Sequence, residues 1–205
     1  MRLPLLAAAL MGVCSPSFGA IVIVSQLSNA AEPPTGVVPT SSNGGPRPAS
    51  FGTATFTIND TFTQMTMVAE VFNLDITGNQ TPNELNDNLT NAHIHAGATV
   101  TPTTNGGVVW GFHGTPFNNN NPADGTVTPF ATGAGGTFTG TWDLLEGNNT
   151  NLTAQINNLV NGRAYINFHS TQFPGGEIRG MIPEPATTVG TLVAGAMLGV
   201  RRRRR

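Results

Sequence analysis

Residues 51–58 read Phe-Gly-Thr-Ala-Thr-Phe-Thr-Ile, a stretch in which apolar and hydroxyl-bearing side chains alternate. A two-residue period of this kind is typical of a β-strand with one buried face and one solvent face. Asn59 and Asp60 follow as turn residues, and residues 62–72 resume with a second apolar-rich run. The segment therefore predicts a β-hairpin, and with it a β-type fold.

Short runs of the same kind recur on both sides of this hairpin. Strands are predicted at residues 21–26, 92–96, 107–113, 138–144, 163–169 and 177–181. Residues 32–50 and 118–125 are rich in Pro, Gly or Asn and predict loops, while the polar residues 77–91 are compatible with a helical turn.

One segment has a helical period instead. Leu152, Ile156 and Leu159 recur at helical spacing and predict a short amphipathic helix within residues 148–161, closed by Gly162. Seven or eight short strands and a single short helix predict an all-β fold, an antiparallel, Greek-key-like β-sandwich.

The charges are distributed unevenly along the chain. Six of the nine basic residues are Arg2 and residues 201–205, and there is no lysine. Residues 20–182 therefore hold three arginines against ten acidic residues, a net charge of −7. Such a domain repels phosphate backbones, so we expect no nucleic-acid partner.

Residues 1–19 have the pattern of a cleavable export signal. Arg2 precedes an apolar stretch too short to span a membrane, and Ser17 and Gly19 supply small residues for cleavage before Ala20 by a signal peptidase. The single cysteine, Cys14, lies in this segment, so the mature domain is expected to hold neither a disulfide nor a thiolate-bound metal.

Residues 183–205 form a second segment outside the predicted domain. Pro183-Glu184-Pro185 precedes an apolar stretch, residues 186–200, and then five arginines, beginning Arg201-Arg202-Arg203. As a helix, the apolar stretch would be about 22 Å long, shorter than the roughly 30 Å hydrocarbon core of a bilayer. It therefore suits a transient membrane anchor, with the arginines on the cytoplasmic side. An ordinary tail anchor is the alternative.

These three parts, in this order, resemble the PEP-CTERM sorting signal. The resemblance implies recognition by an exosortase-type processing enzyme and cleavage near Pro-Glu-Pro. It also implies transient anchoring in the inner membrane of a Gram-negative bacterium, followed by delivery to the cell surface or the extracellular matrix.

The domain between the two ends, residues 20–182, also resembles a known family. The similarity rests on Leu-Ser-Asn-Ala-Ala-Glu-Pro-Pro at 27–34, Ala-His-Ile-His-Ala-Gly at 92–97, Asn-Gly-Gly-Val-Val at 105–109, Ala-Tyr-Ile-Asn-Phe-His-Ser at 164–170 and Pro-Gly-Gly-Glu-Ile-Arg-Gly at 174–180. Together these segments are similar to the CHRD domain, the module repeated in chordin. The resemblance implies a β-sandwich and an extracellular location, and no general activity.

Three of the four histidines lie in those segments. His93 and His95 are two residues apart, so on a strand both imidazoles project from one face, with Cα atoms about 6.5–7 Å apart. His169 lies in another predicted strand, and His113 ends the run 107–113. Because imidazoles without thiolates suit copper or zinc, His93, His95 and His169 are candidate metal ligands.

Copper/zinc superoxide dismutase offers a loose analogy for this set. It too is a Greek-key sandwich with a His-x-His strand and an arginine near the metal, a place that Arg179 could take here. The chain lacks the cysteine pair and the long metal-binding loop of that enzyme. The alternative is structural, because imidazoles also pair well with neighbouring strands and backbone carbonyls.

Glu177 and Arg179 repeat the two-residue spacing and are expected to share a face. Glu177 could accept a hydrogen bond from a metal-ligating histidine, or form a structural ion pair with Arg163 or Arg179.

No other motif assigns a catalytic residue, because the chain has neither a Gly-x-Ser-x-Gly sequence nor a cysteine–histidine pair in the mature domain. The first hypothesis is therefore a non-catalytic surface or matrix protein that contacts an extracellular polymer or a surface protein. The alternative is a surface or periplasmic protein that binds copper or zinc, with dismutase-like chemistry as an extension of it.

Overall fold

A computed structural model of the chain describes residues 19–33 and 36–182. The predicted export signal and the predicted sorting segment both lie outside the described residues. Within these ranges the chain forms nine strands, one α-helix and one short 3-10 helix, all arranged around a single hydrophobic core.

The strands are β1 (Ile21–Ser28), β2 (Phe51–Ile58), β3 (Gln64–Phe72), β4 (Leu89–Ala96), β5 (Gly107–His113), β6 (Thr126–Pro129), β7 (Gly135–Asp143), β8 (Ala164–Ser170) and β9 (Ile178–Ile182). The helices are η1 (Asn29–Ala31) and α1 (Leu152–Val160). The predicted all-β antiparallel fold with one short α-helix is confirmed.

All nine strands belong to one sheet, in the order β5-β4-β8-β9-β1-β2-β3-β7-β6. The hairpin β2–β3 pairs from Phe51–Phe72 to Ile58–Met65, as the alternation at 51–58 predicts. Between β9 and β1 the ladder holds a single pair, Ser28 with Arg179. This weak junction allows the sheet to curl.

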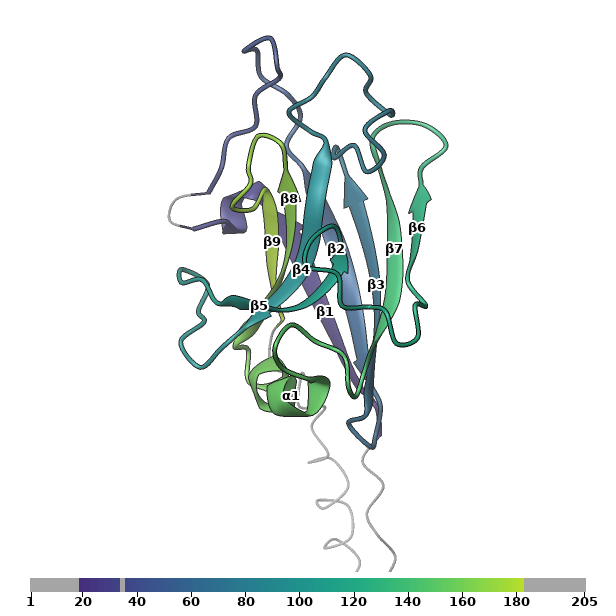
Figure 1. The fold of residues 1–205 in the computed structure, drawn as a ribbon. Helices are drawn as coiled ribbons and strands as arrows, with labels where there is room; N and C mark the ends of the chain where they lie inside the picture. The colour runs from purple at the N-terminus through teal and green to yellow at the C-terminus, as the bar shows by residue number, and fades with distance from the viewer. Residues whose placement is uncertain (1–18, 34–35, 183–205) are drawn as a thin grey trace, which may run out of the picture.

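The curled sheet brings its two ends face to face, as in a sandwich (Figure 1). Trp110 of β5 stacks on Trp142 of β7, with ring centroids 5.7 Å apart and planes 3° apart. Phe112 of β5, Phe138 of β7 and Phe168 of β8 form a group in which each ring packs edge-on against the other two. The two layers of the predicted sandwich are therefore halves of one sheet, closed over an aromatic core.

Two segments differ from the sequence-based expectation. Strand β6 was not predicted, because it is only four residues long, ends in a proline and directly follows a predicted loop. Residues 77–88 contain no helical turn; they form bends and turns that lead into β4.

Helix α1 begins where expected. The side chain of Asn151 caps it by accepting a hydrogen bond from the Ala154 N–H at 3.0 Å.

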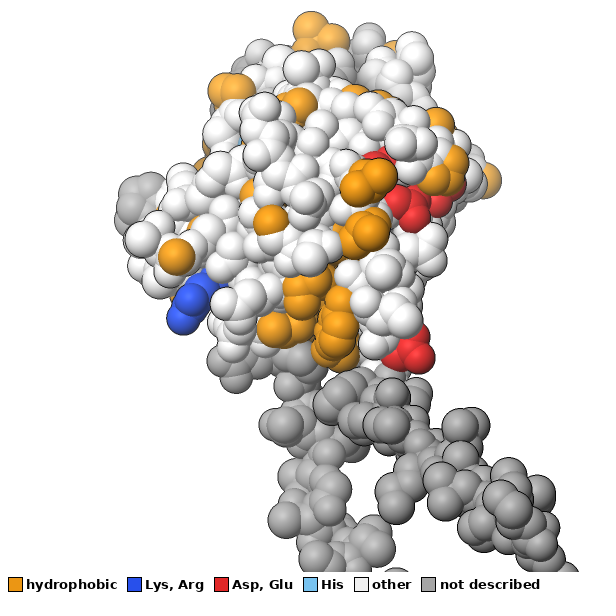
Figure 2. All heavy atoms as spheres, turned by 60° about the horizontal axis from the view of Figure 1, so that its bottom comes forward, with side chains coloured by type: hydrophobic (Ala, Val, Ile, Leu, Met, Phe, Trp, Pro, Cys, Tyr) orange, Lys and Arg blue, Asp and Glu red, His pale blue; other side chains and the backbone are white. Residues whose placement is uncertain are grey.

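The start of β1 and the end of β9 lie at the same end of the fold, near α1 (Figure 1). Figure 2 looks at this end and shows a stripe of hydrophobic side chains with few charged ones around it. No helix within the described ranges is long and apolar enough to cross a membrane.

Candidate metal centre

The strand period determines which side of the sheet the histidines occupy. Ile94 of β4 and Ile166 of β8 pair with each other and are fully buried in the core. His93 and His95 therefore project from the opposite, outer face of β4, and His169 projects from the same face of β8. Loops fold over this face, so that His93, His95 and His169 are only 4%, 9% and 7% exposed.

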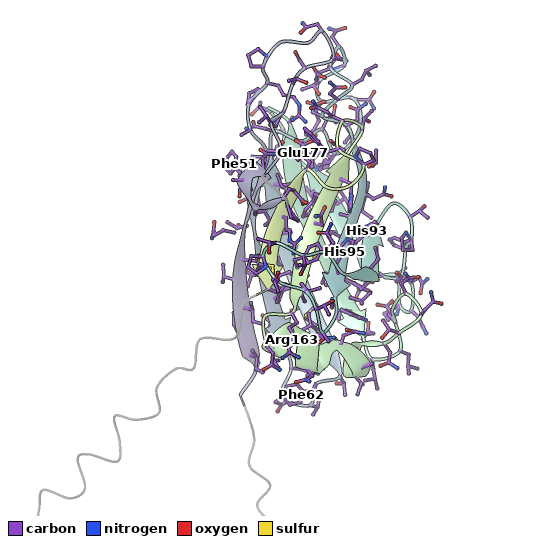
Figure 3. All side chains as sticks on the ribbon, turned by 90° about the vertical axis from the view of Figure 1, so that its left-hand side faces the viewer. Phe51, Phe62, His93, His95, Arg163 and Glu177 are labelled. Carbon is purple, nitrogen blue, oxygen red and sulfur yellow. The ribbon has the colours of Figure 1, made fainter. Side chains whose placement is uncertain are left out.

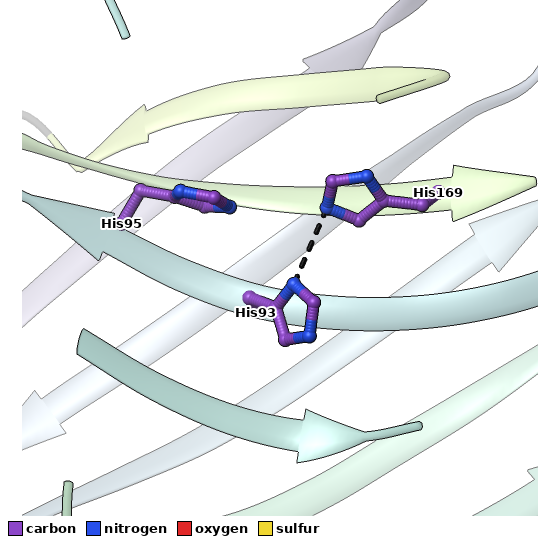
Figure 4. A group of neighbouring side chains, drawn as sticks. All are labelled: His93, His95 and His169. Atoms are coloured by element: carbon purple, nitrogen blue, oxygen red, sulfur yellow. Dashed lines mark hydrogen bonds between the residues drawn. The ribbon is translucent and has the colours of Figure 1, made fainter. Parts of the chain in front are cut away.

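The structure brings these three imidazoles together (Figure 4). One ring nitrogen from each lies within 4.8 Å of the other two. His93 Nδ1 and His169 Nε2 are 3.3 Å apart. His95 Nε2 is buried and has no hydrogen-bond partner within residues 19–33 and 36–182.

The outer nitrogen of each ring donates to a backbone carbonyl. His93 Nε2 donates to Thr115 O, His95 Nδ1 to Gly106 O and His169 Nδ1 to Pro174 O, each at 3.0 Å. A carbonyl oxygen can only accept, so in each case the proton sits on the nitrogen that faces it. In the neutral rings the other nitrogens, His93 Nδ1, His95 Nε2 and His169 Nε2, carry lone pairs that point toward one shared space.

Burial keeps the three rings neutral. Desolvation, and to a smaller extent the repulsion that a protonated His169 would exert, lower the pKa of His93 to about 4, and burial lowers the pKa of His95 to about 4. The pKa of His169 is lowered for the same reason. At neutral pH three neutral imidazoles therefore face one another with their lone pairs, which repel. A cation bound between them removes that repulsion.

The spacing suits a transition metal. Two imidazole nitrogens bound to a tetrahedral zinc at about 2.0–2.1 Å are about 3.3–3.4 Å apart. The observed 3.3 Å between His93 and His169 already has this value. The ring nitrogen of His95 lies within 4.8 Å of both of these nitrogens.

His95 is held by a stack of side chains. Its ring lies parallel to that of Tyr165, with centroids 4.7 Å apart and planes 3° apart. The guanidinium of Arg179 covers the Tyr165 ring at 3.5 Å from its centroid. The Tyr165 hydroxyl accepts a hydrogen bond from the N–H of Gly106, whose carbonyl accepts from His95. This closed set of contacts fixes the orientation of the His95 ring.

Arg179 reaches this site through a loop. Its guanidinium donates to Thr101 O, Thr104 O and Asn105 Oδ1, at 2.8–2.9 Å. These contacts hold the loop between β4 and β5 that carries the Gly106 carbonyl. Arg179 is therefore a positioning residue, completely buried, at the edge of the histidine cluster.

Glu177 lies elsewhere. It is fully buried, pairs with Arg47 at 2.6 Å and accepts a hydrogen bond from the Ser50 hydroxyl. Its described hydrogen bonds include none to an imidazole, and its ion pair is with Arg47 rather than with Arg163 or Arg179. Figure 3 shows Glu177 and Arg163 toward opposite ends of the fold, with His93 and His95 between them.

His113 is also separate from the cluster. Its ring packs edge-on against Phe138, with centroids 5.7 Å apart. The three carbonyls, Tyr165 and Asn167 were not identified from the sequence. A backbone carbonyl has no side-chain signature, and Tyr165 and Asn167 could have been found only by extending the two-residue period backward from His169.

The geometry can be compared with known proteins. The family model of the CHRD domain matches residues 24–182, which include the three clustered histidines and all of the strands except the first three residues of β1. Neither the curated proteins nor the solved structures give a match. CHRD domains are typical of extracellular or secreted proteins. Since the match covers most of the sequence, the chain belongs to the CHRD domain family.

Proposed function

We propose that this CHRD protein binds one copper or zinc ion through His93, His95 and His169. The observation that carries the proposal is the set of hydrogen bonds from the outer ring nitrogens to the carbonyls of Thr115, Gly106 and Pro174. These bonds leave three lone pairs directed at one another inside a buried layer, an arrangement that is unfavourable without a cation.

The donor set favours zinc or copper over harder ions. Three neutral imidazoles suit these metals, whereas calcium and magnesium prefer oxygen ligands. A copper ion held here would also supply one-electron redox chemistry. The dismutase analogy would place the guanidinium of Arg179 at the metal. In the structure it donates hydrogen bonds to the loop carbonyls of Thr101 and Thr104 instead. We therefore propose metal binding and not dismutation.

Titration of the purified, metal-stripped protein with Zn(II) and Cu(II) tests this function. We expect stoichiometric binding of a single ion, which His95→Ala abolishes or weakens by at least an order of magnitude. His113→Ala is the matched control, because it removes a half-buried imidazole outside the cluster. Equal affinity in the wild type and in the His95→Ala variant would refute the proposal.

Export and sorting are part of the same proposal. The chain would enter the export pathway through residues 1–19, lose them to a signal peptidase, and anchor transiently through residues 186–200. An exosortase would then cleave near Pro183-Glu184-Pro185. In support, only these three residues separate the end of β9 from the apolar stretch, so an anchored precursor keeps its α1 end within about 11 Å of the membrane. Two exposed leucines, Leu144 (37% exposed) and Leu145 (78% exposed), follow the end of β7.

Mass spectrometry of the native protein tests the sorting. We expect a mature N-terminus at Ala20 and loss of Arg201–Arg205. Retention of the arginines in a cytoplasmic form would contradict it.

A second candidate function, contact with an uncharged extracellular polymer, is favoured by the outer face of the other half of the sheet. Thr57, Thr66 and Thr141 lie in one cross-strand row over β2, β3 and β7. Further threonines project from the same face at positions 53, 55, 126, 128, 137 and 139. Across β2, β3, β6 and β7 only Glu70 and Asp143 are charged.

Hydroxyl and methyl groups in such rows suit a neutral polysaccharide better than a charged partner. Co-sedimentation with insoluble neutral polysaccharides tests this. The double substitution Thr55→Lys with Thr139→Lys is expected to reduce binding, whereas Thr103→Lys in the β4–β5 loop should not. Equal binding by the two variants would exclude this face.

A further inference from the structure

Glu32 is a buried carboxyl that the proposed ligand set does not use. It follows η1, and the segment folds over the outer face of β8 and β9, leaving Glu32 only 5% exposed. Its Oε1 accepts a hydrogen bond from Asn167 Nδ2. Gly176 packs so tightly on this pair that a Cβ there would lie 2.6 Å from both Glu32 Oε1 and Asn167 Oδ1.

Asn167 connects this carboxyl with the histidine cluster. It lies directly across from His93 in the β4–β8 ladder and two residues before His169 on β8. Side chains directly opposite on one face of an antiparallel pair have Cβ atoms about 4.5–5.5 Å apart. The carboxyl of Glu32 is therefore one side chain away from two of the three proposed ligands.

Several buried polar atoms of this layer have no hydrogen-bond partner among the described residues, including Asn167 Oδ1, His95 Nε2 and Arg179 Nε. Glu32 also lines a cavity of about 260 Å³ together with Asn105, Pro174 and Gly176. Asn105 accepts from Arg179, and Pro174 accepts from His169. The cavity thus joins the carboxyl to the residues that position the cluster, and it gives a proton a path to solvent.

We propose that Glu32 is the charge-compensating carboxylate of the metal site, losing its proton to solvent when a divalent ion binds to the three imidazoles. This inference rests on the proposed metal binding. The imidazoles are neutral before and after binding, so the ion brings two positive charges into a buried layer that already holds Arg179. A carboxylate nearby offsets that charge.

The surroundings of Glu32 agree with this role. Burial, which outweighs the Asn167 hydrogen bond and the charge of Arg179, raises the pKa of Glu32 to about 7. The titratable groups that face it are Arg179 on β9 and Tyr165 on β8, whose own pKa values also respond to Glu32. Of the other two buried glutamates, Glu177 is compensated by Arg47, and Glu146 accepts hydrogen bonds from a tryptophan N–H and three backbone N–H groups. Glu32 is thus protonated in part at neutral pH and can respond to a new charge.

The sign of the coupling follows from linkage. A nearby dication lowers the pKa of a carboxyl, so below pH 7 the binding of the ion releases up to about one proton from Glu32. Affinity then rises by up to about tenfold per pH unit as the pH approaches 7, and the contribution of Glu32 levels off above that. His93 and His95 are already neutral in this pH range, so they add little to the pH dependence of the affinity.

The experiment measures zinc affinity and proton release by calorimetry at pH 6.0, 6.5 and 7.5, in buffers of different ionisation enthalpy. We expect the wild type to release about one proton more than Glu32→Gln at pH 6.0. We also expect the rise in affinity from pH 6.0 to 7.5 to be about tenfold smaller in Glu32→Gln. Glu70→Gln is the control, because it removes an exposed carboxyl of β3 on the other half of the sheet.

Each outcome decides the question. If Glu32→Gln and the wild type bind zinc with equal proton release, the inference is overturned while the proposed metal site stands. If the wild type binds no ion, both fall. Should Glu32→Gln not fold, infrared or NMR titration of labelled Glu32 in the wild type replaces it. Its pKa must then fall on addition of zinc, and an unchanged pKa refutes the inference.

Discussion

His93 Nδ1 and His169 Nε2 lie 3.3 Å apart on neighbouring strands, although each ring already donates its single N–H, on the opposite nitrogen, to a carbonyl. Two neutral imidazoles fixed in this way face each other with lone pairs. Residues 76 positions apart in sequence are thus held at the separation of two ligands on one metal ion.

Acid is expected to destabilise the metal-free protein. The pKa values of His93 and His95 are about 4 in the fold against 6.5 for the free side chain. Between these values the unfolded chain binds more protons, so the stability they contribute is present above pH 6.5 and is lost as the pH falls toward 4. Glu32, with its pKa raised to about 7, opposes this in part.

Urea unfolding in the presence of a chelator measures the effect. Two histidines lower the stability as the pH falls, and one glutamate raises it. We therefore expect the free energy of unfolding to fall by about 1–1.5 kcal/mol per pH unit from pH 6 to pH 5. Glu32→Gln should steepen this dependence. A flat profile in the wild type would show that the imidazoles are not buried in neutral form.

Removal of the aromatic ring at Tyr165 should weaken metal binding without removing a ligand. In Tyr165→Leu the His95 ring loses its parallel stack at 4.7 Å, and we expect roughly a 10- to 100-fold loss of zinc affinity, as for other groups that orient a ligand. Tyr165→Phe keeps the stack and loses only the 3.3 Å contact with the Gly106 N–H, so its affinity should remain close to that of the wild type. An equal loss of zinc affinity in the two variants would contradict the idea that the stacked ring orients His95.

The ion pair between Glu177 and Arg47 is expected to stabilise the fold and to leave metal binding unchanged. Because both partners are buried, Glu177→Gln leaves an uncompensated guanidinium and should cost about 3–5 kcal/mol of unfolding free energy. Replacing both residues, as in Arg47→Met with Glu177→Gln, should cost less than the single change. Thermal denaturation and zinc titration of both variants measure the two effects. A lower affinity in the folded Glu177→Gln variant would instead connect Glu177 to the metal.

Gly111 should be required for the loop that orients His93. A Cβ at this position would lie 1.8 Å from Pro116 O, so Gly111→Ala must displace the loop that carries the Thr115 carbonyl. We expect both lower stability, by about 1–3 kcal/mol, and weaker zinc binding. Gly107→Ala, on the same strand with nothing within 4 Å of the added Cβ, is the control and should behave like the wild type. Calorimetry and thermal denaturation of the pair compare them directly.

Local patterns in the sequence were enough to predict the elements whose residues have a regular period. The alternation at 51–58 predicts β2 and its hairpin with β3, and the spacing of Leu152, Ile156 and Leu159 predicts α1. The same two-residue period places His93 and His95 on one face, because side chains on a strand alternate whatever lies beside it. Strand β6 was missed because it is only four residues long, ends in a proline and buries none of its residues.

The groups that surround those histidines could be found only from the tertiary structure. The distance from His93 to His169 depends on the register of β4 against β8, and the shape of the core depends on one sheet curling until Trp110 meets Trp142. Both are pairings between residues far apart in sequence, which no local period encodes. The carbonyls that fix the rings, and the place of Glu32 beside Asn167, come from loops that fold over the sheet. The sequence could therefore name the three histidines, and only the fold could bring their facing ring nitrogens together.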